Sequence, residues 1–353
     1  MKFAIVAITE NGAGLARRLG RAFPTATVYL PARFGADDGC HPFREPVTEL
    51  LPRLFARQEG LVCIMAAGIA VRALAPYLKG KEVDPAVVVM DEAGQFAVSL
   101  LSGHLGGAND LAREVAGAAG ARAVITTATD VCGLPAWDDV ARREGLGIEP
   151  VKNIRRLNSL LLRGEKIALA DRQGLVAPHF TGVPGVEGVS TFAQAIRSHR
   201  AGKVFVTNRH FPQLEEQEDF LVLRPRNLVV GIGCNRHTSA EEIEEAVTGA
   251  LQHAFLSLKS VAALASILDK ADETGLTLFA GKYRLPVEFH TAEALNAVPV
   301  PTDPSPHALA AVGAKGVCEP AALLSAGGGA NLLVKKKIMG NVTVAVAEKG
   351  PDA

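Results

Sequence analysis

Short apolar runs alternate with helical patterns along the first part of the chain. Apolar residues recur at helical spacing in Gly14–Arg21, Val47–Arg57 and Asp110–Gly120. The runs around them predict strands at Phe3–Ile8, Leu61–Met65, Ala86–Met90 and Ala123–Thr126. Such alternation is typical of an α/β sandwich with a largely parallel sheet, which we expect for an N-terminal domain over residues 1–145.

The pattern changes after this domain. The basic helical segment Lys152–Arg163 precedes strand-like runs at Ile167–Ala170 and Lys203–Thr207, which lie among proline-containing turns. We interpret residues 146–226 as a small middle domain.

A third unit, residues 227–353, opens with an apolar strand that we expect to end in a turn at Gly231–Gly233. The spacing of Ser239 and Glu242 is that of a capping box, which predicts a helix starting near Ala240. An edge strand is expected at Val342–Ala347. We therefore predict a C-terminal α/β/α domain with a mixed sheet, and a multi-domain α/β chain as a whole.

Composition narrows the classes of partner. The 37 basic and 37 acidic residues leave no net charge, which argues against nucleic acid as a partner. The longest nearly apolar run, Leu61–Val71, is too short to cross a bilayer, so no membrane partner is expected. The first apolar stretch lacks a signal-peptide cleavage site, which predicts a cytoplasmic protein. The five cysteines never form a C-x-x-C pair, so neither a disulfide framework nor a zinc site is indicated.

The segment Ser99–Asp110 carries the most specific chemistry. It places Ser102, Gly103, Gly106 and Gly107 around one imidazole, His104, just before an expected helix. Glycine lets a ligand approach the backbone, and free N–H groups at a helix start can hold an anion. An imidazole near its usual pKa of about 6.5 can exchange a proton at neutral pH, so His104 is the first candidate for a general base. A tight turn with a packed histidine is the alternative interpretation.

Polar residues also follow other expected strands. Asp91 and Glu92 come after one strand, and Thr126, Thr127 and Asp130 come after another. Because ligands bind at the carboxyl ends of parallel strands, these residues are candidates for the same site. Simple turn-capping roles would explain them equally well.

Positive charge follows the glycine at position 68. Arg72, Lys79 and Lys81 lie just beyond Gly68, and such a rim suits a ligand with several carboxylates.

Three common motifs are missing. The Gly231–Gly233 segment lacks the third glycine of a dinucleotide fingerprint, and no P-loop sequence occurs. No G-x-S-x-G elbow surrounds Ser102, so this serine is not a recognisable hydrolase nucleophile.

Several segments, taken in order, closely resemble the cobalt-precorrin-5A hydrolases of the anaerobic cobalamin (vitamin B12) pathway. The resemblance covers nearly the whole chain, with the middle region least diagnostic, and departs from the family at Ala67 and His237. The matching segments are Met65–Arg72, Asp84–Glu92, Leu100–Asn109, Thr126–Asp130, Val230–Arg236, Glu293–Asn296, Val312–Gly313, Val317–Leu324 and Val342–Ala345.

The resemblance implies a ring-contracted cobalt tetrapyrrole substrate. Its δ-lactone would be hydrolysed and the C20 fragment would leave as acetaldehyde, giving cobalt-precorrin-5B. No cofactor and no protein-bound metal are expected, because the cobalt enters with the substrate. The acetate and propionate arms of such a substrate suit glycine-rich helix starts and basic side chains.

On this basis we expect His104, oriented by Asp91, Glu92 or Asp130, to activate water, with N–H groups at Gly106 and Gly107 stabilising the oxyanion. The residues expected to bind substrate are Gly68, Arg72, Ser102, Gly103, Gly106, Gly107, Asn109, Thr126, Thr127, Gly231, Gly233, Asn235 and Arg236.

Two other classes of function stay open at this point. A non-catalytic tetrapyrrole carrier would share the anion-holding loops but need no base. A nucleotide-binding oxidoreductase would depend on the glycine turns at positions 68 and 231 alone. The sequence does not determine the number of subunits, and a homodimer is compatible with it.

Overall fold

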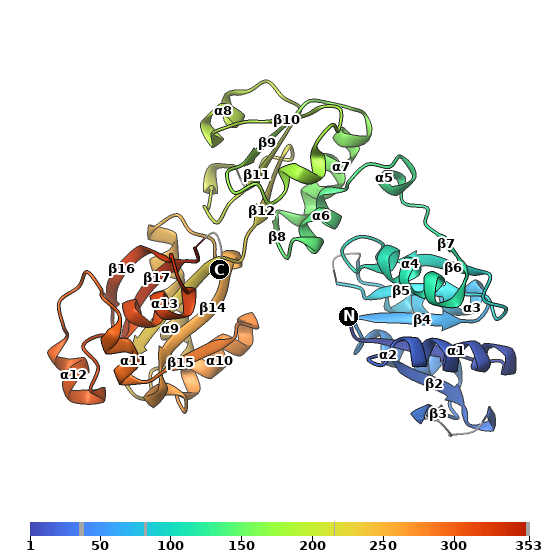
Figure 1. Ribbon diagram of the computed structural model, residues 1–353, viewed down its shortest axis with the longest axis horizontal. Coiled ribbons are helices and arrows are strands. Elements are labelled where there is room, and N and C mark those ends of the chain that lie inside the picture. Colours follow the sequence, from blue (N-terminus) through green and yellow to red (C-terminus); the bar gives the residue numbers. More distant parts are fainter. Residues whose placement is uncertain (35–38, 81–82, 215, 351–353) are drawn as a thin grey trace. The chain divides into compact units, whose positions relative to one another are not determined.

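The computed structural model describes residues 1–34, 39–80, 83–214 and 216–350 (Figure 1). The chain divides into two compact units, one of residues 1–143, 158–164 and 182–184 and one of the remaining residues. The strands form three sheets, and each sheet falls within one of the ranges expected for the three domains. The mixed α/β class predicted from the sequence is confirmed.

The N-terminal sheet has the strand order β3-β2-β1-β4-β5-β6-β7. Strands β1 to β5 run parallel, whereas β6 pairs antiparallel with β5 and β7 runs parallel to β6. The strands are β1 (Phe3–Ala7), β2 (Thr27–Pro31), β3 (His41–Phe43), β4 (Gly60–Ile64), β5 (Ala86–Met90), β6 (Phe96–Leu101) and β7 (Arg122–Val124).

Helices cover both faces of this sheet. Alternate residues of β1 point to opposite faces, so Ile5 packs in one core cluster and Val6 in the other. The first cluster includes residues of α1 (Glu10–Ala22) and α4 (Ala108–Ala119), and the second includes residues of α2 (Val47–Phe55) and α3 (Ala67–Leu74). Burial on both sides explains the continuous apolar runs of the parallel strands.

The reversed direction of β6 and β7 decides where the candidate residues lie. The segments that follow β4 and β5 begin at one end of the strands, here called one edge of the sheet. Those that follow β6 and β7 begin at the opposite end. The length of β6 separates the two edges by about 17 Å, at about 3.4 Å per residue. The expectation that all candidate residues share one edge is therefore wrong.

The second sheet has the order β10-β9-β11-β12-β8, with β8 antiparallel to β12. Its strands are β8 (Gly147–Glu149), β9 (Ile167–Asp171), β10 (Val186–Gly188), β11 (Gly202–Val206) and β12 (Phe220–Arg224). The helices of this stretch of chain are α5 (Ala128–Val131), α6 (Trp137–Arg143), α7 (Ile154–Leu162) and α8 (Phe192–Arg197).

The C-terminal sheet is mixed, as predicted, with the order β15-β14-β13-β17-β16. The strands are β13 (Leu228–Cys234), β14 (Val261–Ile267), β15 (Val287–His290), β16 (Asn331–Met339) and β17 (Val342–Glu348). The helices are α9 (Ala240–His253), α10 (Thr274–Tyr283), α11 (Ala292–Ala297), α12 (Pro306–Val312) and α13 (Cys318–Ala326).

One expectation for this sheet is confirmed and two are corrected. Helix α9 begins at Ala240, and the Ser239 hydroxyl accepts a hydrogen bond from the N–H of Glu242. The expected turn at Gly231–Gly233 is wrong, because β13 continues to Cys234. The expected edge strand is β17, but it lies between β13 and β16, so the edge strand on that side of the sheet is β16.

No helix within the described ranges is long and apolar enough to cross a membrane.

Candidate active site

The segment between β6 and α4 forms a tight loop around His104. Ser102 adopts a left-handed conformation with φ of 58°. A Cβ atom at Gly106 would lie 2.4 Å from the Cβ of Ser102, so the loop closes only with glycine at this position. The loop therefore holds the imidazole at the end of the sheet where β6 terminates.

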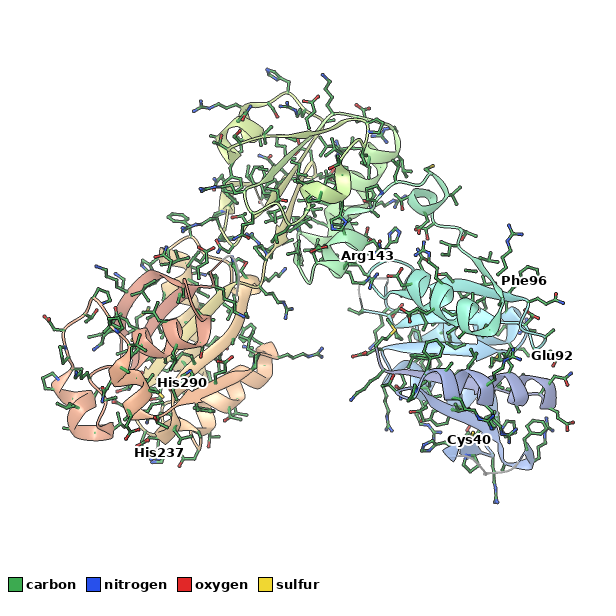
Figure 2. The ribbon with its side chains drawn as sticks, in the orientation of Figure 1. Cys40, Glu92, Phe96, Arg143, His237 and His290 are labelled. Carbon is green, nitrogen blue, oxygen red and sulfur yellow. The ribbon has the colours of Figure 1, made fainter. Side chains whose placement is uncertain are left out.

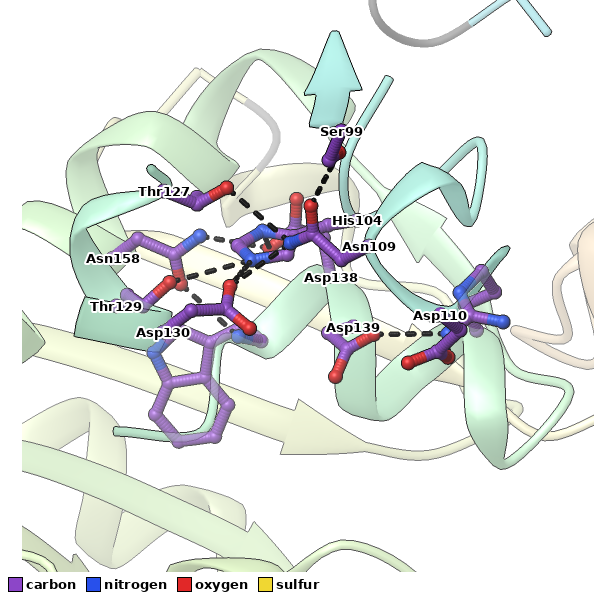
Figure 3. Close-up of polar contacts among 12 residues, drawn as sticks. Ser99, His104, Asn109, Asp110, Thr127, Thr129, Asp130, Asp138, Asp139 and Asn158 are labelled. Carbon is purple, nitrogen blue, oxygen red and sulfur yellow. Dashed lines mark hydrogen bonds and ion pairs between the residues drawn. The ribbon is translucent and has the colours of Figure 1, made fainter. Parts of the chain in front are cut away.

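Two carboxylates hold the His104 ring, one at each nitrogen (Figure 3). Nε2 lies 2.9 Å from Oδ2 of Asp130, and Nδ1 lies 3.3 Å from Oδ1 of Asp138. The hydroxyl of Thr129 lies 3.3 Å from Nε2. The side chain of Asp138 is 4% exposed and that of Asp130 is 18% exposed, so Asp138 is the inner partner and Asp130 the outer one.

The surroundings favour the protonated ring. Burial by itself lowers the pKa of His104, but the hydrogen bonds and charges of Asp138 and Asp130 outweigh it, so the pKa is raised above its usual value. Burial by itself raises the pKa of Asp138, but the bonds from His104 and Asn158 outweigh it and lower the pKa. Both carboxylates therefore stabilise the charged form of the ring relative to its neutral form.

Asp138 is positioned by two helices. It lies in the first turn of α6, next to the buried Trp137. The Asn158 amide, on α7, donates to Oδ1 of Asp138 at 2.8 Å and accepts from the backbone N–H of Trp137 at 3.0 Å. These bonds fix the inner carboxylate against the ring.

Asp130 is held from the other side. The buried Asn109, on α4, donates to Oδ2 of Asp130 at 3.0 Å and receives a bond from the Ser99 hydroxyl at 2.7 Å. Arg113 donates to Oδ1 of Asp130 at 2.6 Å and to Asp110 at 2.8 Å. Asp130 therefore has two donors besides His104.

Further ion pairs surround Asp110. Asp110 also contacts Arg142 and Arg143, and both arginines pair with Asp139 at 3.0 Å. Asp130 thus lies at one end of a network of alternating charges that crosses α4 and α6.

The expected oxyanion donors are mostly occupied. The Gly107 N–H donates to the carbonyl of His104, and the N–H groups of Ala108 and Asn109 donate to the carbonyls of Ser102 and Gly103. The expectation that Gly107 presents a free N–H to the substrate is therefore wrong.

Asp91, Glu92, Gly68 and Arg72 lie away from His104. Asp91 accepts bonds from the N–H groups of Gln95 and Phe96 and so holds the turn between β5 and β6. Figure 2 shows Glu92 and Phe96 at the end of this unit opposite Arg143, which contacts Asp110. The expectation that Asp91 or Glu92 orients His104 is therefore wrong.

Gly68 and Arg72 belong to the same far edge. They follow β4, and Arg72 places its guanidinium within 3.3 Å of where a Gly68 Cβ would lie. Lys81, expected beside them, lies outside the described residues. Of the two expected threonines, Thr126 is exposed and Thr127 receives a bond from Asn109 at 3.3 Å.

The C-terminal candidates have separate roles. Gly231 is buried in β13 beneath α13, where a Cβ would lie 1.8 Å from the carbonyl oxygen of Cys318, so it serves packing and not binding. Gly233, Asn235 and Arg236 line a cavity at the end of β13. They lie in the other compact unit from His104.

Sequence reasoning missed Asp138, the inner partner of His104. A usable signal was present, because the carboxylate stands on the same helical face as Trp137 and Ala141, which are apolar. A carboxylate on a buried face needs a partner, and His104 supplies it. The carboxylates meet different ring nitrogens, and no group of His, Cys, Asp or Glu suited to a metal ion occurs in the part of the chain that the structure describes.

Comparisons with known proteins agree along the chain. Residues 49–130 match the family described as cobalamin synthesis G N-terminal, 135–225 match the cobalamin biosynthesis central region, and 228–347 match the cobalamin synthesis G C-terminus.

Similar full-length proteins are also known. A cobalt-precorrin-5A hydrolase of Priestia megaterium is 39% identical over 98% of this chain and 94% of its own length. The enzyme of the same name from Salmonella typhimurium is 33% identical over 83% of both chains. A solved structure of a cobalamin biosynthesis protein G homologue from Sulfolobus solfataricus is similar over 98% of this chain and 96% of that one, with 22% identity and a TM-score of 0.36.

Proposed function

The chain belongs to the cobalt-precorrin-5A hydrolase family, and on that premise we propose that it opens the δ-lactone of cobalt-precorrin-5A and releases the C20 fragment as acetaldehyde, giving cobalt-precorrin-5B. It is a hydrolase of cobalamin biosynthesis. The cobalt is part of the substrate, and the proposal requires no separate cofactor.

We assign the proton transfers to His104. In its neutral form, with the proton on Nδ1 held by Asp138, the ring can accept a proton at Nε2 from a water molecule that replaces the Asp130 carboxylate there. Nε2 takes a proton as the water oxygen adds to the lactone carbonyl. As the ester C–O bond breaks, Nε2 returns this proton to the departing alkoxide oxygen. The new carboxylic acid loses its proton to solvent, which leaves a carboxylate, an alcohol and a neutral ring.

The second stage needs a base again. Removal of the proton from the alcohol allows the neighbouring C–C bond to break, so that acetaldehyde leaves and the electron pair stays on the macrocycle. The same Nε2 accepts this proton, and the negative charges of Asp130 and Asp138 stabilise the imidazolium that forms.

One observation carries the assignment: both nitrogens of a half-buried imidazole meet carboxylates, inside the two segments that match the family. An orienting acid on one nitrogen and a reacting group on the other is the arrangement by which a histidine base is held in its working tautomer. The paired acids distinguish this ring from a histidine that merely fills space.

The test is a single-turnover reaction with His104→Asn. Under anaerobic conditions with cobalt-precorrin-5A, trapped acetaldehyde should appear at least about 100-fold more slowly than with the parent, which is the lower end of a general-base contribution. His199→Asn, at an exposed position between α8 and β11, is the matched control for an exchange of this kind. Release at the parent rate by His104→Asn would refute the assignment.

A carrier without catalysis would give a different result. It would bind the substrate tightly and leave its mass unchanged, with no acetaldehyde from the parent protein. The same experiment therefore separates the two functions.

A further inference from the structure

A cavity of about 360 Å³ opens at the carboxyl ends of β13 and β14 in the C-terminal sheet. Gly233 and Ile267 at the strand ends, and Lys336 and Thr343 from β16 and β17, contribute to its walls. The parallel strand β14 flanks β13 on one side and the antiparallel β17 flanks it on the other. Ligands of open α/β sheets usually bind outside the carboxyl ends of the strands.

The charges around this cavity favour an anion. Arg236, Lys270 and Lys336 line it, against one carboxylate, that of Asp269. Lys270 is buried and lies 3.3 Å from Glu273, so part of its charge is balanced. Lys336 differs, because its ammonium group forms no ion pair within the described residues.

The remaining surface of the cavity is apolar and loosely covered. Ala308, Ala311 and Val312 of α12 lie along it, and no residue of α12 is buried. The segment is tied at its base, where the Ser305 N–H donates to the carbonyl of Lys315. Val312 also packs against the core cluster of this unit, so α12 forms one wall of the cavity.

We infer that this cavity is a second substrate-binding site, which takes one carboxylate-bearing edge of the tetrapyrrole and lies in a different unit from His104. The inference rests on the proposed function for the identity of the ligand. A volume of about 360 Å³ is near the lower end of the roughly 300–1,000 Å³ of small-molecule pockets, so it holds an edge of the macrocycle with its acid arms and not the whole ring.

A nucleotide fits the cavity less well. Phosphates are usually held by free backbone N–H groups of a glycine turn. Gly231 is buried in mid-strand, and the N–H of Asn235 already donates to the carbonyl of Asn341. The anion must therefore be bound by the cationic side chains that line the cavity. Such side chains suit the separate carboxylates of a flat apolar ring.

The test measures binding of uroporphyrin III, an octacarboxylate tetrapyrrole without a lactone, to the full chain by fluorescence quenching. Lys336→Ala should raise the Kd about tenfold, which corresponds to the loss of one charge-assisted contact. Lys337→Ala is the matched control, because Lys337 is an exposed neighbour on the same strand and does not line the cavity. Its Kd should stay within about twofold of the parent value.

A variant in the other unit provides the second readout. His104→Asn should bind uroporphyrin III with the parent Kd.

The outcomes separate this inference from the proposed reaction. Equal effects of the two lysine variants, an unchanged Kd in Lys336→Ala, or no uroporphyrin III binding by the parent would overturn the second site. Lys336-dependent binding without acetaldehyde release by the parent would support the site and refute the reaction. Preferential displacement of uroporphyrin III by ADP at equal concentration would also overturn the inference.

Discussion

Replacement of Asp138 by asparagine tests the site most directly. The carboxylate is 4% exposed and lies 3.3 Å from Nδ1 of His104. Two unit charges at this distance attract by about 5 kcal/mol at an effective dielectric constant of about 20. This value is an upper limit for the stabilisation of the imidazolium that the variant loses. The amide keeps the shape of the side chain and can still accept the bond from Asn158.

The expected cost to catalysis is close to this limit. Without the inner charge, the imidazolium formed during both proton transfers loses its main stabilising partner. We expect kcat/KM to fall about 1,000-fold, equivalent to about 4 kcal/mol. The assay is anaerobic acetaldehyde release from cobalt-precorrin-5A, followed by hydrazone trapping.

The neighbouring aspartate provides the control. Asp139→Asn makes the same chemical change one residue further along α6, where the carboxylate pairs with Arg142 and Arg143 and not with His104. We expect less than about a fivefold change in this variant. If Asp138→Asn retained activity within threefold of the parent, the inner acid would have no part in the reaction.

Three further expectations follow from the same structure. Glu92→Gln, at the far edge of the sheet, should leave kcat/KM unchanged, whereas a loss like that of Asp138→Asn would restore Glu92 as a partner of His104. The pairing of His104 and Asp138 should stabilise the fold fully between pH of about 3.9 and 6.5, which are the pKa values of Asp and His in the unfolded chain. This stabilisation should be lost as the pH rises through the raised pKa of His104, and also as the pH falls through the lowered pKa of Asp138. Urea unfolding of the parent and Asp138→Asn should therefore differ most near pH 5.5, and the difference should shrink as the pH rises through the raised pKa of His104. Gly231→Ala should lower the free energy of unfolding by about 3 kcal/mol, because its Cβ would meet the Cys318 carbonyl oxygen at 1.8 Å. An unchanged melting temperature would contradict this packing.

Local patterns predicted the elements well. The apolar runs at Phe3–Ile8 and Ala86–Met90 became β1 and β5, and the capping spacing at Ser239 located the start of α9. The glycine-rich loop around His104 and the turn carrying Asp130 were also found, and the structure brings these two residues together. Each of these features depends on a short window of sequence.

Features that depend on chain direction were not predictable in this way. A strand has the same alternation whether it runs up or down the sheet, so nothing in Phe96–Leu101 indicated that β6 is reversed. That reversal places Asp91 and His104 at opposite edges. Asp138 was missed for a related reason, because its partner lies more than thirty residues earlier in the chain and is brought to it only by tertiary packing.

The pairing of β5 with β6 also has a consequence for the order of folding. The parallel strands of this sheet pair across long stretches of chain, since Phe3 must meet Gly60 and Leu61 must meet Val87. The β5–β6 hairpin closes through one short turn, which costs the least chain entropy. The strand that leads into the His104 loop is thus attached by the most local contact in its sheet, and its amides should gain protection from hydrogen exchange before those of β1.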